Sequence, residues 1–418
     1  MNKKLTKLLT VTLVVVMMLA LAVPVFAADP PESLNATGAV EIDKQLTVAA
    51  GVNTPELTFT FEVTSAKGSG AIENWTAMDG ILEGVKIGNT SYTEKGESAN
   101  IKEGKITTTL TFNASANATA NPKQGFVIDF NGVEWTEPGY YRYTVKETAG
   151  GDSRVEYDTT TTYIIDVYVG YESDDATDLS ILSVVVTKAG NSGNSAIYEV
   201  EEDEDEDGYG EVDEKLDSTP GGSSSTGWTA DGESDAVIEN VWPSYTLKVE
   251  KTVTGNQGDK NKEFTFKITG IQNCPDGKYT ISYSGTGTST TRPTEVTVSN
   301  GSISAVGSSP ATELEITLKH GQSFSIAGLP RTAKCIITES NNDTYTVSYQ
   351  INSYDAKDGS TCELTDGTGM FEDTTVVFTN NKEGIIPTGV LLTIAPFAAL
   401  MLIGLVGITV VVLKKKHN

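Results

Sequence analysis

A set of strand-like segments occurs twice in this chain, about 200 residues apart. Alternation of apolar and polar residues is typical of β-strands, and no long stretch has helical periodicity. The sequence therefore predicts an all-β fold with two tandem sandwich domains. Each copy has an alternating segment, a Phe-Thr-Phe triplet, a second alternating segment and a short segment that contains an asparagine. In the first copy these segments are 40–48, 59–61, 138–147 and 236–240, and in the second copy they are 247–253, 264–266, 329–339 and 376–380.

Three polar residues in each copy occupy positions that strand geometry assigns to the apolar face. Side chains alternate faces along a strand, so residues two positions apart point the same way. Burying a charged or amide group without a partner is costly, so three together require a specific arrangement. The residues are a lysine, a glutamate and an asparagine: Lys44, Glu147 and Asn240 in the first copy, and Lys251, Glu339 and Asn380 in the second.

Two interpretations fit such a buried trio. The simpler is a Lys–Glu ion pair with a hydrogen bond from the asparagine. The second is chemical: burial lowers the pKa of a lysine and raises that of a glutamate, which produces a neutral nucleophilic amine and a proton donor. An amine held against a carboxamide, with a protonated carboxyl polarising the carbonyl, can expel ammonia and leave an amide cross-link. Proximity supplies the rate that an unactivated amide lacks.

The chain resembles the streptococcal pilin family, whose domains form their own Lys–Asn isopeptide bonds. The resemblance covers essentially the whole chain and is specific at 157–163, 378–382, 386–390 and 395–396. It implies immunoglobulin-like β-sandwich domains of the collagen-adhesin B type. It also implies bonds between Lys44 and Asn240, assisted by Glu147, and between Lys251 and Asn380, assisted by Glu339.

The two ends of the chain predict export and anchoring. Lysines precede an apolar stretch, and small residues precede Ala28, which is typical of a signal peptide over 1–27. Near the other end, Ile386, Pro387, Thr388 and Gly389 come directly before an apolar segment at 390–413 and a basic tail at 414–418. This arrangement resembles a cell-wall sorting signal, which sortase cuts between Thr and Gly. A plain transmembrane anchor is the alternative.

Charge and residue usage exclude several functions. A formal net charge of -26 opposes binding to nucleic acid. Only two histidines are present, His320 and His417, so a Ser-His-Asp triad, a Cys-His pair or a histidine zinc site is not expected. The three cysteines have no metal-ligand spacing, and one pair could be bridged. We therefore expect a structural protein rather than an enzyme, with no cofactor.

A polar insert interrupts the first copy at 188–235 and includes an acidic run from 201 to 207. The simpler interpretation is a flexible, self-repelling surface loop. Alternatively, part of the insert matches the spacing of a calcium-binding loop, although no amphipathic helices flank it and acidic runs produce such matches by chance. The candidate ligands are Asp203, Asp205, Asp207 and Glu214.

These features predict a signal peptide (1–27), a first domain (28–243), a second domain (244–383) and a sorting signal (384–418). The favoured function is a pilus shaft subunit, and the alternative is a monomeric wall-anchored adhesin or stalk. The expected partners are sortase, neighbouring pilin subunits and peptidoglycan, with a host surface as a further candidate. The family resemblance places the acceptor lysine just before Asn240, but 229–239 contains none, so Lys188 and Lys215 are the nearest candidates.

Overall fold

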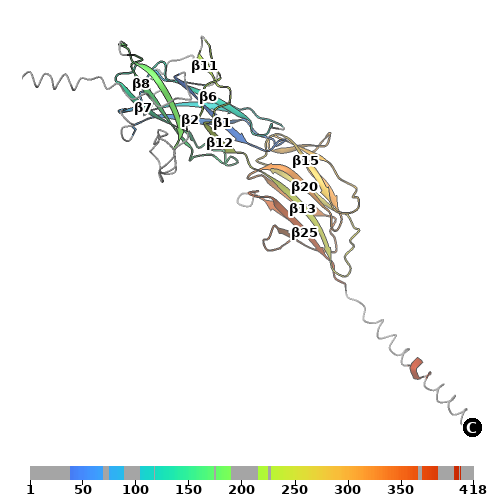
Figure 1. Cartoon of the computed structure of the whole chain (residues 1–418). Helices are drawn as coiled ribbons and strands as arrows, with labels where there is room; N and C mark the ends of the chain where they lie inside the picture. The colour runs from blue at the N-terminus through green and yellow to red at the C-terminus, as the bar shows by residue number, and fades with distance from the viewer. Residues whose placement is uncertain are drawn as a thin grey trace, which may run out of the picture.

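The structure is a computed structural model of the 418-residue chain. It describes residues 38–68, 75–88, 104–116, 118–173, 176–189, 215–224, 227–365, 370–384, 400–403 and 405. The predicted signal peptide, sortase motif and calcium loop lie outside these residues. Two β-sandwich domains lie end to end (Figure 1). Among the described residues, no helix is long and apolar enough to span a membrane.

The first domain consists of two facing sheets. One has the strand order β12-β1-β6-β4; the other has the order β5-β2-β7-β8-β9, with β3 also paired to β7. A short hairpin, β10-β11, lies beside them. The strands are β1 (Ala39–Thr47), β2 (Leu57–Ala66), β3 (Ala77–Asp79), β4 (Lys86–Gly88), β5 (Lys105–Phe112), β6 (Lys123–Asp129), β7 (Gly139–Thr148), β8 (Thr162–Gly170), β9 (Ser180–Lys188), β10 (Gly222–Ser224), β11 (Gly227–Thr229) and β12 (Val237–Val241).

The second domain repeats this plan with a longer first sheet, in the order β18-β17-β16-β15-β20-β13-β25-β22-β23, and a second sheet in the order β19-β14-β21-β24. Its strands are β13 (Ser244–Thr254), β14 (Phe264–Gln272), β15 (Gly277–Ser284), β16 (Glu295–Ser299), β17 (Ser302–Val306), β18 (Ser309–Pro310), β19 (Leu314–Leu318), β20 (Ser323–Pro330), β21 (Lys334–Ser340), β22 (Thr346–Ile351), β23 (Lys357–Asp358), β24 (Thr361–Leu364) and β25 (Thr374–Asn381). The predicted all-β fold is confirmed.

The first and last strands of each domain are parallel neighbours. β1 pairs with β12, and β13 pairs with β25. Parallel strands cannot be joined by a tight turn, so the rest of each domain forms the connection between them. Residues that begin and end a domain are therefore brought side by side in one sheet.

The two domains contact each other through polar groups around the link between β12 and β13. The side-chain amide of Asn53 donates to the Lys278 carbonyl at 3.0 Å, and Arg331 pairs with Glu156 at 3.2 Å. Trp242, in the two-residue link, is buried, and the Arg154 guanidinium lies 5.1 Å from the centre of its ring. Because the link is short and held on both sides, the domains are closely coupled.

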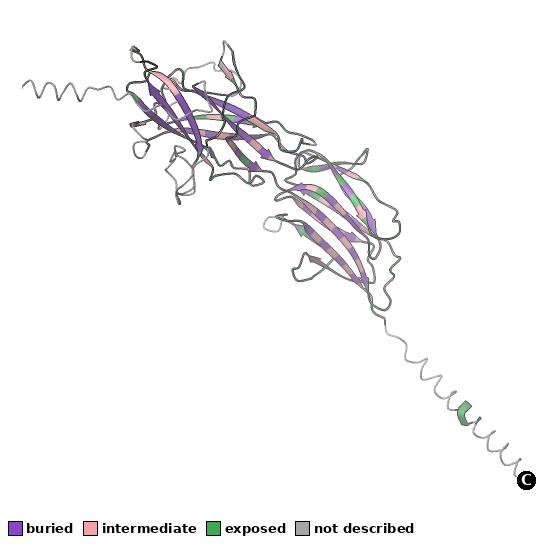
Figure 2. Ribbon diagram, viewed as in Figure 1, coloured by how far each residue is buried: buried purple, intermediate pink, exposed green. Residues whose placement is uncertain are grey.

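Strand β1 is buried on both faces, which the alternating sequence did not predict. Burial is continuous from Ala39 to Lys44, whereas β13 alternates between buried and half-buried residues (Figure 2). The outer face of β1 is covered by the end of the stretch that we expected to be a flexible insert. Within 215–235, the Gly232 N–H donates to Glu41 at 2.7 Å, and the Ser234 N–H donates to Asp43 at 3.0 Å. This part of the insert is packed against the domain.

Two carboxyl groups lie together beneath this segment. Burial and a hydrogen bond with Asp43 raise the pKa of Glu41 from 4.5 to about 7. Lys123 Nζ lies 2.7 Å from Asp43 Oδ2, and Asp43 Oδ1 has no hydrogen-bond donor among the described residues. Glu41 therefore takes up a proton at a higher pH than a carboxyl in water does.

We expect Glu41→Gln to change how the stability of the first domain depends on pH. A raised folded-state pKa contributes stability that is complete below pH 4.5 and lost as the pH rises through about 7. Glutamine remains neutral, so the variant should gain up to about 3 kcal/mol relative to the parent between pH 4.5 and pH 8. Urea unfolding at a series of pH values measures this difference. The exposed Glu83→Gln is the control, and parallel profiles for parent and Glu41→Gln would contradict the prediction.

Candidate functional site

The parallel strand pairs bring the predicted lysine and asparagine of each domain together at the same offset. Lys44 lies opposite Ile238, so Asn240 is two residues further along and on the same face. In the second domain Lys251 lies opposite Phe378, and Asn380 is again two residues further along. Because side chains at i and i+2 share a face, lysine and asparagine both point into the sandwich.

The glutamate comes from the facing sheet. Glu147 lies on β7 opposite Phe61 of β2, and Glu339 lies on β21 opposite Phe266 of β14. Both carboxylates point inward and are nearly inaccessible, at 4% and 2% exposure. Packing of one sheet on the other thus completes each trio.

In the first domain a single carboxylate connects the other two side chains. Lys44 Nζ lies 2.6 Å from Glu147 Oε2, and Asn240 Nδ2 donates to Glu147 Oε1 at 2.6 Å. Lys44 and Asn240 are both 0% exposed. The amine and the carboxamide are therefore held at the two oxygens of one group, without access to water.

The second domain has the same trio in a looser arrangement. Asn380 Nδ2 donates to Glu339 Oε1 at 2.5 Å, but Lys251 Nζ lies 3.4 Å from Glu339 Oε2. Lys251 also donates to the carbonyls of Thr252 at 3.1 Å and Phe378 at 3.2 Å. The lysine is thus shared between the carboxylate and the backbone.

Burial shifts the pKa values in the direction that amide chemistry requires. Desolvation lowers the pKa of Lys44 and raises that of Glu147, and the attraction between the two groups opposes both shifts. Desolvation lowers the pKa of Lys251 to about 8 and raises that of Glu339. Each pair can therefore move a proton from amine to carboxylate at lower cost than it could in water.

The repeated Phe-Thr-Phe triplet has a function that the sequence analysis did not assign. The ring of Phe59 lies 4.8 Å from Lys44 Nζ, and the ring of Phe264 lies 4.6 Å from Lys251 Nζ. The second phenylalanine of each triplet is the cross-strand partner of the glutamate. In the sequence, the only sign of this role was that the Phe-Thr-Phe triplet follows each lysine segment.

The asparagine oxygens differ between the domains. The Asp158 N–H donates to Asn240 Oδ1 at 2.7 Å. Because an N–H must face an acceptor, this contact establishes which end of the Asn240 amide is oxygen. The expected role of the glutamate in polarising that carbonyl does not fit this geometry, since Glu147 contacts the amide nitrogen. In the second domain, Asn380 Oδ1 has no hydrogen-bond donor among the described residues.

The other predicted sites are placed as follows. Lys188 is exposed at the end of β9, and Lys215 is half-buried, with its backbone bridged to Thr187. The sortase residues 386–389 and the calcium candidates lie outside the described residues. The part of the chain that the structure describes contains no group of three or more potential metal-binding side chains.

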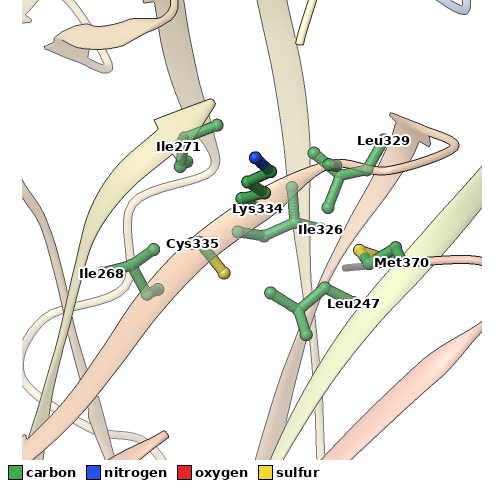
Figure 3. Close-up of a pocket in the computed structure, with 9 residues that line it drawn as sticks. Leu247, Ile268, Ile271, Ile326, Leu329, Lys334, Cys335 and Met370 are labelled. Carbon is green, nitrogen blue, oxygen red and sulfur yellow. The ribbon is translucent and has the colours of Figure 1, made fainter. Parts of the chain in front are cut away.

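The second domain contains three buried thiols and a small cavity. Cys274, Cys335 and Cys362 are free, and burial raises the pKa of Cys274 and Cys362 to about 12. The cavity has room for no more than about one water molecule, which is too little for a ligand. It is mostly apolar (Figure 3), with the lining residues Leu247, Ile268, Ile271, Ile326, Leu329, Ala333, Lys334, Cys335 and Met370.

Comparison with known proteins agrees with this geometry. Residues 40–199 match the family described as Spy0128-like isopeptide containing domain. A pilin from Streptococcus pyogenes serotype M1 is 25% identical over 372 residues, which is 87% of this chain and 92% of that pilin. The first domain thus matches an isopeptide-domain family, and the chain as a whole is similar to a streptococcal pilin. Residues 245–382, the second domain, match a separate family, Domain of unknown function (DUF7601).

A solved structure supports the same fold, and a second relative matches part of the chain. The major pilin from Streptococcus pyogenes has a crystal structure that aligns with a TM-score of 0.51 at 19% identity, covering 83% of this chain and 99% of that one. The pilus tip adhesin Cpa from Streptococcus pyogenes is 34% identical over 149 residues, which is 35% of this chain but only 18% of the adhesin. The pilin similarity therefore extends over both domains, whereas the adhesin similarity is local.

We expect Glu339→Ala to destabilise the second domain selectively. The substitution leaves Lys251 buried without its carboxylate, which typically costs about 3–5 kcal/mol. Limited proteolysis and urea unfolding should show early loss of the second domain while the first is retained. Glu147→Ala should have the converse effect, and Glu339→Gln, which keeps an oxygen near Lys251, should lose less. Equal losses in both domains would contradict the independence of the two sites.

Proposed function

We propose that this chain is a pilus shaft subunit whose two domains each form a Lys–Asn isopeptide bond. The observation that carries the proposal is the recurrence of one buried trio at the same strand register in both domains. A structural ion pair would explain one such site. Two sites built alike, in a chain similar to a pilin over 87% of its length, favour a shared chemical purpose.

The proposed reaction balances without a cofactor. Lys44 Nζ transfers a proton to Glu147 Oε2 and attacks Asn240 Cγ. The Cγ–Nδ2 bond breaks as Glu147 Oε1, which faces that nitrogen, passes the proton to Nδ2 and ammonia leaves. Nζ then gives a second proton to the Glu147 carboxylate, so the products are one secondary amide, one ammonia and a protonated Glu147. Glu147 acts as a shuttle between two atoms that it already contacts, and Glu339 has the same place beside Lys251 and Asn380.

The bonds would protect the subunit against tension. Pulling on the start of β1 and the end of β12 loads two parallel neighbours in shear. With the bonds in place, the covalent path crosses from Lys44 to Asn240, follows the link to Lys251 and crosses to Asn380. It bypasses loops of 196 (240 − 44) and 129 (380 − 251) positions. By analogy with disulfides, each bond would also remove loop entropy worth roughly 5 kcal/mol from the unfolded chain.

Intact mass tests the cross-links directly. A fragment spanning 28–383 should weigh two ammonia molecules less than its sequence mass, and trypsin should release branched peptides that join Lys44 to Asn240 and Lys251 to Asn380. In Glu339→Ala and in Glu147→Ala, only one bond should form, so each variant should weigh one ammonia less than its sequence mass. A parent mass equal to the calculated mass would exclude both bonds.

Polymerisation requires a lysine that a sortase can reach. Lys44 and Lys251 are buried, whereas Lys188 is exposed. We therefore propose Lys188 as the acceptor for Thr388 of a neighbouring subunit, ahead of the half-buried Lys215. The absence of a lysine from 229–239 favours the monomeric wall-anchored stalk as the second candidate function. In both cases we propose export, sortase processing and attachment to peptidoglycan.

Lys188→Arg should convert a ladder of polymers in wall extracts to monomer, because arginine keeps the charge but stays protonated and cannot act as the nucleophile. Lys215→Arg should leave the ladder intact. Immunoblots of wall extracts from cells that express each variant measure this. A ladder that survives Lys188→Arg would exclude that acceptor, and a parent strain without a ladder would favour the monomeric stalk.

A further inference from the structure

The Tyr-Asp-Thr-Thr-Thr-Thr-Tyr motif at 157–163 contains the donor to the reactive amide of the first domain. The motif ends the β7–β8 connection and includes the first two residues of β8, and its Asp158 N–H points at Asn240 Oδ1, at 2.7 Å. The reaction proposed above places negative charge on this oxygen when the amine adds to Cγ. A fixed N–H at this distance is the geometry of an oxyanion donor.

Two independent contacts hold this N–H in place. The Asp158 carboxylate accepts hydrogen bonds from the backbone N–H groups of Thr160 at 3.0 Å and Thr161 at 2.9 Å, which closes the turn. Two residues earlier, Glu156 exchanges both of its backbone hydrogen bonds with Val241, at 2.9 Å and 3.0 Å. Val241 directly follows Asn240, so the loop is attached to the strand that carries the reacting residue.

The second domain provides an internal comparison. Its lysine, glutamate and asparagine match those of the first domain, but Asn380 Oδ1 is buried without a donor among the described residues. The two sites therefore have the same nucleophile and proton shuttle, and they differ in the contact to the amide oxygen and in the looser contacts of Lys251.

We propose that the Asp158 backbone N–H is a catalytic oxyanion donor for the first isopeptide bond, with the Asp158 side chain as its positioning group. The proposal rests on the proposed cross-linking reaction. The N–H stabilises the negative oxygen of the tetrahedral intermediate while Nζ–Cγ forms and before Cγ–Nδ2 breaks, and is itself unchanged. The first bond consequently forms faster than the second.

The direct test replaces the peptide bond between Tyr157 and Asp158 with an ester. The α-hydroxy acid that corresponds to Asp158 is incorporated during cell-free translation of the full chain. Samples are quenched in denaturant at intervals, and each bond is followed by its branched tryptic peptide. The ester removes this N–H and keeps every side chain, so formation of the first bond should slow by about 100-fold or more, the usual effect of removing one oxyanion donor. The second bond in the same molecules should form at its parental rate.

Side-chain variants separate catalysis from folding. Asp158→Asn keeps an oxygen acceptor for the turn and should form the first bond at nearly the parental rate. Asp158→Ala loses the turn and should slow the bond, by a smaller factor than the ester. Because Glu147→Ala blocks the first bond and itself destabilises the first domain, urea unfolding compares the Glu147→Ala chain with and without the ester. Equal transitions for the two show that the first domain tolerates the ester.

The outcomes are distinguishable. An ester variant that forms the first bond at the parental rate overturns the inference, as does one in which both bonds slow equally or the first domain fails to fold. A parent in which neither bond forms overturns the proposed function itself. Selective slowing of the first bond in a folded domain supports the inference.

Discussion

Desolvation of one lysine, one glutamate and one asparagine in each sandwich is the constraint on which the rest of this structure depends. Water would keep the amine protonated and the carboxyl ionised, whereas the dry core moves both pKa values toward the neutral forms. To exclude water, two sheets must close over the trio, and a phenylalanine ring must cover each amine. The chemistry and the hydrophobic core are therefore formed by the same residues.

The contacts of the buried trio differ between the two domains. The first site has one short contact at each carboxylate oxygen and a donor on the amide oxygen, whereas the second shares its lysine with two backbone carbonyls. The first domain also has the packed end of the insert over the outer face of β1, next to the parallel β1–β12 pair. Extra contacts in the first domain thus surround the strands that would carry tension.

Much of the fold and of the core of the site was predictable because strand parity is a local property. Alternation placed Lys44, Lys251, Glu147 and Glu339 on buried faces, and the repeat implied two similar domains. The outer face of β1 was not predictable, because Glu41 and Asp43 are polar and their cover comes from about 190 positions away. No local pattern in β1 could indicate that partner.

An all-β repeat with buried lysine, glutamate and asparagine follows from the amino-acid sequence, because strand periodicity and composition are properties of neighbouring residues. Which atom of each asparagine amide faces which partner depends on the three-dimensional fold. In the first domain the Glu147 carboxylate contacts the Asn240 nitrogen, and the Asp158 N–H contacts the Asn240 oxygen. In the second domain the Asn380 oxygen has no donor among the described residues. These contacts join distant segments through backbone groups, which every residue but proline possesses, so residue identity does not reveal them.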